Sequence, residues 1–351
     1  MRQLQINDKV IDDSSNCYVI AEIGHNHQGD LEQCKRMFAA AAQAGASAVK
    51  LQKRDNRSLF TRAAYEQVYN SENAFGATYG EHRQALEFDR AQYSELQQYA
   101  KELRIDFFAT AFDLPSLDFL LELDVPALKI ASGDLKSVHL LRAAARSGKP
   151  LIVSTGASDL VDVQRANEVL SSEGASFALL QCTAGYPPEY EELDLAVITT
   201  YRELFPGVVV GYSGHDSGIA MATAAYVLGA RVVEKHFTLN RALKGTDQAF
   251  SLEPVGMRKL VRDLQRTRTA MGDGVKRRHD SEVLPGQKMG KKLVAARDLA
   301  PGHVITEQDV AYKSPGDGMY PYQLDQVLGR TLTRGLAEEQ SFSPDVLVAV
   351  P

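Results

Sequence analysis

The sequence predicts an α/β protein, a (β/α)8 TIM barrel followed by a small C-terminal domain. Short apolar runs alternate with helical segments eight times over roughly 255 residues, the length that such a barrel needs. An open doubly wound sheet is the competing fold, but no GxGxxG turn opens the chain and eight units exceed its usual number. Polar side chains also gather where the predicted strands end, as expected at the active-site face of a barrel.

Each repeating unit consists of a strand and the helix after it. The strands are β-branched or apolar runs bounded by polar residues, and helices close on glycines such as Gly45. The expected strands are 17–23, 48–52, 106–110, 127–130, 151–154, 177–181, a run ending at 212, and one from 232. The expected helices are 31–44, 90–103, 114–123, 138–147, 160–173, 195–204, 218–228 and 255–271, with a long loop at 54–87.

The chain after residue 272 has a different pattern. Residues 273–288 are rich in glycine and charge and are predicted to be a linker. Residues 289–351 have short apolar stretches broken at 300–302 and 314–318, which indicates a compact module with little regular helix. A module of about sixty residues is marginal alone and is expected to pack on a partner surface. The expected domains are therefore the barrel at 1–272, the linker, and the module at 289–351.

Composition excludes several classes of protein. The net charge is −6 and no long basic block occurs, which argues against a nucleic-acid surface. No apolar run reaches the ~18 residues of a membrane span, and the N-terminus lacks the apolar core of a signal peptide. We therefore expect a cytoplasmic protein. The three cysteines lie far apart without CxxC spacing, so buried thiols are expected instead of disulfides.

Two histidines lie at the ends of consecutive strands. His215 follows the apolar run 208–210, and His236 follows Val232 and Val233. The helical segment between them has the length of a crossover, so both strands are parallel and both histidines reach one edge of the sheet. Each histidine could simply cap its strand. As a pair with Glu234 nearby, they favour a divalent metal site completed by water or carboxylate.

Two lysines, Lys50 and Lys129, also lie at strand ends, where an uncompensated ammonium is costly unless it meets an anion. The hydroxyls expected at the same end of the barrel are those of Thr110, Ser132, Ser154 and Ser213. Salt bridges to Glu22 or Asp134 are the simpler interpretation of the lysines. Together, two lysines and several hydroxyls suit a phosphate plus a carboxylate. An anionic substrate would then lie beside a Lewis acid that can polarise a carbonyl.

Seven segments, taken together, resemble the sialic acid synthase family, manganese-dependent enzymes that condense phosphoenolpyruvate with N-acetylmannosamine or its 6-phosphate. The segments are AEIGHNHQG (21–29), VKLQ (49–52), KIASGD (129–134), STG (154–156), LQCT (180–183), GYSGH (211–215) and EKHFT (234–238). Their order across the whole barrel is far more specific than any one of them. The tail resembles that family's antifreeze-like SAF domain, a β-clip module.

The resemblance implies a role for each matching residue. His215 and His236 would hold Mn²⁺ or another divalent metal. The residues that would hold phosphoenolpyruvate are Lys50, Thr110, Lys129, Ser132, Ser154 and Ser213. The residues that would face the sugar are Gln52, Asn73, Tyr186 and Asp247. Glu22 or Asp134 would manage protons. The metal would polarise the sugar aldehyde during attack by C3 of phosphoenolpyruvate, and phosphate would leave by C–O cleavage after water addition.

The resemblance also bears on partners and on the acceptor. It implies a domain-swapped homodimer in which one subunit's small domain caps the other's barrel. Free-sugar members carry an arginine in that cap, and Ser314 stands at the matching position here. The segment FGATYGEH (75–82) resembles the branch that takes the 6-phosphate. Arg54, Arg57 and Arg83 could serve a sugar phosphate.

Three alternatives remain at this stage. A related synthase could make deaminated neuraminic, legionaminic or pseudaminic acid by the same chemistry. A metal-dependent hydrolase on the same barrel is possible because His25 and His27 form an HxH pattern after the first strand. A non-catalytic or ice-binding protein would rest only on the tail and would leave the polar barrel mouth unexplained.

Overall fold

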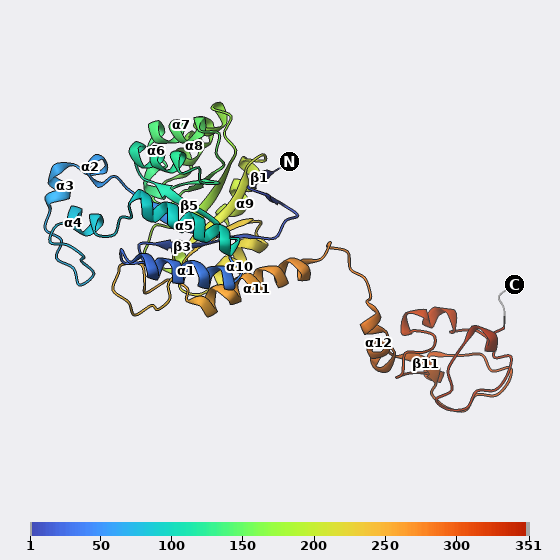
Figure 1. Ribbon diagram of the computed structural model, residues 1–351. Coiled ribbons are helices and arrows are strands. Elements are labelled where there is room, and N and C mark those ends of the chain that lie inside the picture. The colour runs from blue at the N-terminus through green and yellow to red at the C-terminus, as the bar shows by residue number, and fades with distance from the viewer. Residues whose placement is uncertain (1, 349–351) are drawn as a thin grey trace. The chain divides into compact units, whose positions relative to one another are not determined.

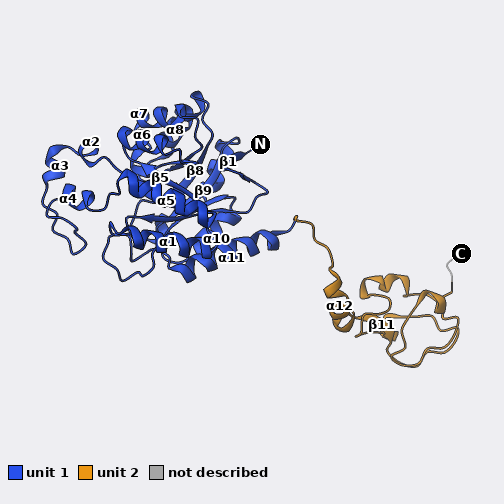
Figure 2. Ribbon diagram, viewed as in Figure 1, with its two compact units in different colours: residues 1–272 blue, residues 273–351 orange. Residues whose placement is uncertain are grey.

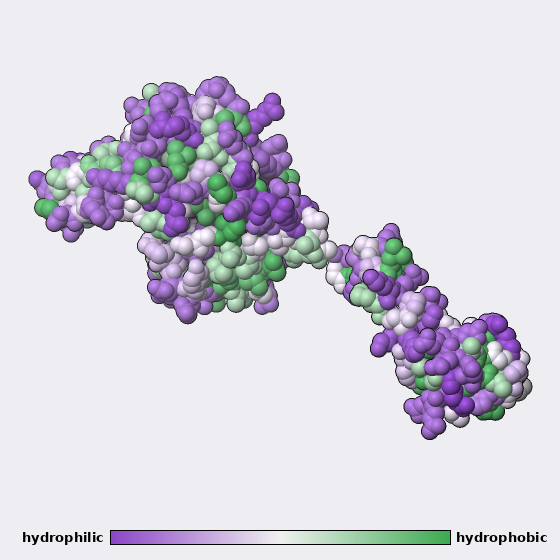
Figure 3. Space-filling model, turned by 90° about the horizontal axis from the view of Figure 1, so that it is seen from below, coloured by the Kyte–Doolittle hydropathy of each residue, from purple (hydrophilic) through white to green (hydrophobic). Residues whose placement is uncertain are grey.

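The computed structural model describes residues 2–348 and divides into two compact units, Met1–Gly272 and Asp273–Pro351 (Figures 1 and 2). The first unit contains a closed barrel and the second a small antiparallel sheet. On the face shown in Figure 3, hydrophilic residues dominate the surface of each unit and hydrophobic ones are scattered among them. Among the described residues, no helix combines the length and apolar composition that a membrane crossing needs.

Eight parallel strands close the barrel in the order β10, β3, β4, β5, β6, β7, β8, β9, which confirms the predicted TIM barrel. Their bounds are β3 (Tyr18–Gly24), β4 (Ala48–Lys53), β5 (Asp106–Ala111), β6 (Leu128–Ile130), β7 (Leu151–Ser154), β8 (Phe177–Cys182), β9 (Val209–Gly214) and β10 (Val232–His236). These strands are almost entirely buried, because helices cover one face and the packed barrel interior covers the other.

The helices that cover the barrel begin at capping side chains. Asp30, Asp89, Asp113 and Asp159 each accept a hydrogen bond from the backbone N–H three residues later, which satisfies a helix-end donor. The covering helices are α1 (Leu31–Gln43), α5 (Arg90–Leu103), α6 (Leu114–Glu122), α7 (Val138–Arg146), α8 (Leu160–Ser172), α9 (Val197–Leu204), α10 (Ala220–Val227) and α11 (Pro254–Met271). Their apolar faces join the strands in one continuous core.

A hairpin of β1 (Gln3–Ile6) and β2 (Lys9–Asp12) precedes the barrel and was not predicted. Leu4, Ile6 and Ile11 are buried while Val10 is exposed, and Lys9 Nζ lies 2.7 Å from Asp106 Oδ2 at the start of β5. Tyr18, at the start of β3, donates to the same carboxylate at 2.7 Å. The hairpin therefore covers the amino-terminal end of the barrel, opposite the predicted site.

The stretch predicted as a long loop, 54–87, contains the helices α2 (Asn56–Leu59), α3 (Arg62–Glu66) and α4 (Tyr79–Gln84), which project from the barrel in Figure 1. Each begins at a capping residue, and Thr78 and Glu81 form a reciprocal capping box on α4. Helices of four to six residues are too short to show a 3.6-residue repeat, so sequence periodicity could not reveal them.

The second unit has its own core. Its strands β11 (Lys292–Ala295) and β12 (Val310–Lys313) pair antiparallel, and Leu293, Ile305 and Phe342 are fully buried in its apolar cluster. Helix α12 (Val283–Met289) lies partly within the stretch predicted to be a linker. The 3-10 helices of the two units are η1 (Ser132–Asp134), η2 (Tyr190–Glu192), η3 (Asp280–Glu282), η4 (Glu307–Asp309), η5 (Pro321–Gln326) and η6 (Pro344–Val346).

Candidate active site

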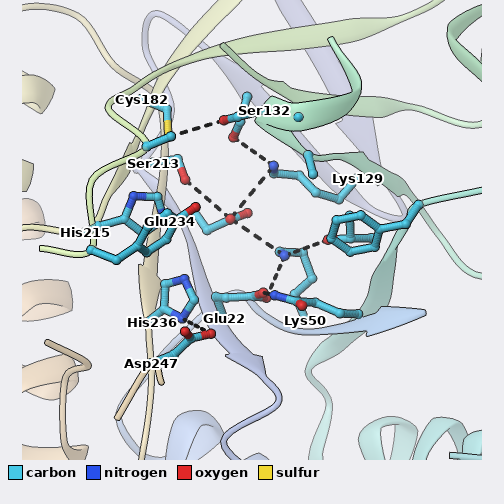
Figure 4. Close-up of a pocket in the computed structure, with 18 of the residues that line it drawn as sticks. Glu22, Lys50, Lys129, Ser132, Cys182, Ser213, His215, Glu234, His236 and Asp247 are labelled. Carbon is cyan, nitrogen blue, oxygen red and sulfur yellow. Dashed lines mark hydrogen bonds and ion pairs between the residues drawn. The ribbon is translucent and has the colours of Figure 1, made fainter. Parts of the chain in front are cut away.

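A cavity of about 720 Å³ opens at the carboxyl ends of the barrel strands (Figure 4). The predicted site residues that line it are Glu22, Lys50, Gln52, Asn73, Thr110, Lys129, Ser132, Ser154, Tyr186, Ser213, His215, His236 and Asp247. Asp134 is the one predicted site residue outside this lining: it lies on η1 and accepts a hydrogen bond from Ser137 Oγ at 3.3 Å. Burial raises the pKa of Asp134 to about 6.

The floor of the cavity carries two lysines and two glutamates (Figure 4). Lys50 Nζ lies 2.6 Å from Glu22 Oε2 and 3.7 Å from Glu234 Oε1, and it donates to Thr110 Oγ1 at 2.9 Å. Lys129 Nζ lies 3.9 Å from Glu234 Oε1 and donates to Ser154 Oγ at 2.7 Å. All four charged side chains are buried, so the floor is internally compensated before any ligand binds.

The two floor glutamates differ in acidity. Burial raises the pKa of Glu22 to about 7, although Lys50 opposes the shift. Burial acts on Glu234 as well, but Lys129 and Lys50 outweigh it and lower the pKa of that carboxyl. Burial also lowers the pKa of Lys129. Glu22 is therefore the floor carboxyl that can gain or release a proton near neutral pH.

The imidazoles of His215 and His236 converge at the rim, with ring centroids 5.2 Å apart. Nδ1 of His215 donates to the carbonyl of Thr183 at 2.9 Å, which leaves its Nε2 with a free lone pair. Nδ1 of His236 is buried without a hydrogen bond, and the nearest carboxylate oxygen, Asp247 Oδ2, is 3.7 Å away. Burial lowers the pKa of His236, which favours the neutral imidazole.

This donor set fits a divalent metal, since neutral imidazoles and carboxylates suit Mn²⁺ and similar ions. His215 and His236 could hold the ion, with Asp247 beside them. In the part of the chain that the structure describes, no group of three or more such side chains is arranged as a metal site. A metal held here would therefore take its remaining ligands from water or substrate.

A buried network fixes the segment that carries His215. Lys235 Nζ and Tyr212 Oη both donate to Asp216 Oδ1, at 2.9 and 2.7 Å. Lys235 is adjacent to two cavity-lining residues of β10 and points to the opposite side of the strand, as strand alternation requires. A Cβ on Gly214 would come within 2.6 Å of that same Asp216 oxygen, so only glycine fits there.

Sequence reasoning noted Glu234 beside His236 but gave it no role. The signal was present, because position 234 precedes 236 by two and so points to the same side of β10. Cys182 also lines the cavity, with Sγ 3.5 Å from Ser132 Oγ. Burial alone would raise the pKa of this thiol, but His215 and Ser132 outweigh it and lower the pKa. Cys34 and Cys182 are buried as expected, while Cys17 is half-buried.

The HxH pattern considered for a hydrolase has other contacts. Both ring nitrogens of His25 face arginines, Arg54 Nη1 at 3.0 Å and Arg83 Nη1 at 3.2 Å. His27 accepts a hydrogen bond from the backbone of Gly29 at 3.0 Å, and its ring stacks on Phe88. Both histidines are thus engaged within the fold, which removes the basis of the hydrolase interpretation.

Residues 37–276 match the model of the NeuB family, and residues 292–348 match the SAF domain. The chain belongs to the NeuB family. It is an enzyme of this family of phosphoenolpyruvate-condensing nonulosonic acid synthases. The resemblance to sialic acid synthases and the SAF assignment of the tail are thereby confirmed.

Relatives of this NeuB-family enzyme carry different product names. Human N-acetylneuraminate-9-phosphate synthase is 37% identical over 332 residues, which cover 94% of this chain and 92% of the human one. The N,N'-diacetyllegionaminic acid synthase of Legionella pneumophila is 35% identical over 330 residues, 92% of each chain. The N-acetylneuraminic acid synthetase of Leptospira borgpetersenii, solved with citrate, superposes with a TM-score of 0.71 at 32% identity, covering 81% of this chain and 95% of that one.

Proposed function

We propose that this NeuB-family enzyme condenses phosphoenolpyruvate with N-acetylmannosamine or its 6-phosphate and water. The products are N-acetylneuraminate or its 9-phosphate, and inorganic phosphate. The observation that carries the proposal is the cavity floor, where Lys50 and Lys129 donate to Thr110 and Ser154 in the same cavity as the two converging imidazoles. Human N-acetylneuraminate-9-phosphate synthase, which matches most of this chain, supports the same reaction class.

Each group of side chains has a task in this reaction. Lys50 and Lys129 bind the phosphate and carboxylate of phosphoenolpyruvate by charge-assisted hydrogen bonds. The hydroxyls that add further hydrogen bonds are those of Thr110, Ser132, Ser154 and Ser213. Gln52, Asn73, Tyr186 and Asp247 orient the sugar. The buried site keeps the two substrates close and limits stray water around the reacting carbons.

C3 of phosphoenolpyruvate forms the new bond to the aldehyde carbon of the sugar. Water then adds to the resulting oxocarbenium carbon, and phosphate leaves with cleavage of its C–O bond. Glu22 exchanges the protons of these steps, because its raised pKa lies close to neutral pH. A divalent metal, when bound at His215 and His236, would supply Lewis-acid polarisation of the aldehyde.

A second acceptor class has its own support. The relative from Legionella pneumophila is named for N,N'-diacetyllegionaminic acid and matches 92% of this chain. Ser314, which stands where free-sugar synthases carry a cap arginine, also leaves the recognition of an N-acetyl group open. Synthesis of a related nonulosonic acid from another amino sugar is therefore the alternative, with the same residues in the same tasks.

Phosphate release tests this proposal. Chelator-stripped protein receives phosphoenolpyruvate with N-acetylmannosamine or its 6-phosphate, with and without Mn²⁺. We expect release that requires both the metal and one of the sugars. Phosphate release that is independent of added metal would contradict the metal site. If no phosphate is released with either sugar, other amino sugars should be tested as acceptors.

We also propose that the enzyme acts in the cytoplasm as a homodimer in which the SAF unit of one subunit caps the barrel of the other. The support is the resemblance to the sialic acid synthase family, and the separate core of the second unit makes such an exchange of units physically possible. Light scattering should give twice the chain mass of 38.5 kDa. A mass of one chain would contradict the exchange.

A further inference from the structure

Two arginines, Arg54 and Arg83, line the cavity. Arg54 follows β4 and is buried, with its guanidinium carbon 3.7 Å from the centroid of the Phe112 ring. Its Nη2 donates to Gln52 Oε1 at 2.7 Å. Arg83 lies on α4, and its Nη2 and Nε donate to Tyr79 Oη at 2.9 and 3.1 Å. The stacked ring and these hydrogen bonds hold both guanidinium groups in the cavity wall.

Neither guanidinium is compensated by a carboxylate. Among residues 2–348, no carboxylate oxygen lies within 4.0 Å of a guanidinium nitrogen of Arg54 or Arg83, although the backbone N–H of Arg54 donates to Glu87 Oε2 at 3.3 Å. The neighbouring Lys53, in contrast, pairs with Glu87 at 2.9 Å, and the floor lysines pair with Glu22 and Glu234. Two buried or half-buried cations in one cavity wall without a paired carboxylate are costly, and an anionic ligand would relieve that cost.

His25 separates the two arginines and cannot satisfy both of them. Burial, followed by the two guanidinium charges, lowers the pKa of His25 well below its ordinary value, so the ring is neutral. A neutral imidazole carries one N–H and one lone pair. Because Arg54 faces Nε2 and Arg83 faces Nδ1, one arginine meets an acceptor and the other meets an N–H. One guanidinium therefore lacks the acceptor that an added anion would provide.

We propose that Arg54 and Arg83, held apart by His25, form the binding site for a phosphate at the end of the acceptor sugar remote from its aldehyde. The inference rests on the proposed function and selects the phosphorylated sugar as the preferred acceptor. A phosphate dianion presents several oxygens to two guanidinium forks, which suits this pair better than a single carboxylate does.

Two features place this anion on the sugar and not on phosphoenolpyruvate. Arg83 also lines a small neighbouring pocket together with Thr246 and Asp247. The floor lysines, in contrast, donate to the strand-end hydroxyls of Thr110 and Ser154. Gln52 connects the two regions, because it donates to Glu22 Oε1 at 2.8 Å and accepts from Arg54. Phosphoenolpyruvate thus has the two floor lysines and their hydroxyls, and the arginines remain for the acceptor.

The test compares kcat/KM for N-acetylmannosamine 6-phosphate and for N-acetylmannosamine in the wild-type enzyme and in Arg83→Gln. We expect the wild type to prefer the phosphorylated sugar. Arg83→Gln should reduce this preference by between about 10-fold and 100-fold, the effect of losing one charge-assisted pair. The change should appear in KM for the sugar and not in KM for phosphoenolpyruvate. Arg83→Lys, which keeps the charge, should restore part of the preference.

Arg57→Gln is the matched control. Arg57 lies in the same loop, but its guanidinium stacks over Tyr65 at 3.6 Å and it does not line the cavity, so the preference should not change. A wild type that prefers the free sugar, an equal loss on both sugars, or a raised KM for phosphoenolpyruvate would each overturn the phosphate site. Activity with neither sugar would instead overturn the proposed function, so the two failures are distinguishable.

Discussion

Replacing His236 with alanine is expected to abolish phosphoenolpyruvate-dependent turnover while the barrel stays folded. Nδ1 of His236 is buried, has no hydrogen bond among the described residues and lies 3.7 Å from Asp247 Oδ2, so the proposed metal would supply the partner that its lone pair lacks. Strand β10 is held in place by its main-chain pairing with β3 and β9, which the substitution leaves intact. Removing one of two imidazole ligands should lower kcat by on the order of 1,000-fold or more.

Three measurements check this result. Phosphate release gives the turnover, calorimetric titration of Mn²⁺ into chelator-stripped protein gives metal binding, and thermal unfolding reports the fold. His139→Ala serves as the control, because His139 is an exposed residue of α7 far along the chain from either imidazole. Full activity in His236→Ala would refute the metal assignment. Loss of activity with unchanged Mn²⁺ binding would show that His236 acts on the substrate and not on the metal.

The second large effect concerns the floor carboxyl. Glu22→Gln should lower kcat by between about 100-fold and 10,000-fold, the range for loss of a general acid or base. Asp134→Asn should retain most of its activity, because that carboxylate pairs with Ser137 outside the cavity lining. The two variants separate the two carboxyls that the sequence left as alternatives. The opposite ranking would assign proton transfer to Asp134.

The raised pKa of Glu22 also predicts how stability depends on pH. Its pKa rises from an ordinary 4.5 to about 7 on folding, so the folded protein keeps this proton where the unfolded chain has lost it. The contribution of protonated Glu22 to the free energy of unfolding is full below pH 4.5 and is lost as the pH rises through about 7. Urea unfolding of metal-free protein at pH 5 and 8 should show this loss, at between about 2 and 3 kcal/mol relative to Glu22→Gln. If the free energy of unfolding depends on pH equally in the wild type and in Glu22→Gln, the raised pKa of Glu22 is contradicted.

Much of the site could be predicted because barrel topology fixes where a strand ends. Once eight strands are recognised, the polar residues at their carboxyl ends, Lys50 and His215 among them, must share one cavity. Contacts between distant loops leave no such periodic signal. The pairing of Arg54 with Arg83 across His25 depends on the short helices between 54 and 87, and the position of Asp134 depends on a single 3-10 turn.

The hairpin of β1 and β2 bears on how far the cavity can change without disturbing the barrel. Lys9, Tyr18 and Asp106 tie the hairpin to the strand starts, at the end of the barrel opposite the cavity. Mutations that reshape the rim around Arg54 and Arg83 therefore leave this closure undisturbed. This separation lets the cavity change without loss of the closed barrel end; relatives of 35% and 37% identity are named for different nonulosonic acids.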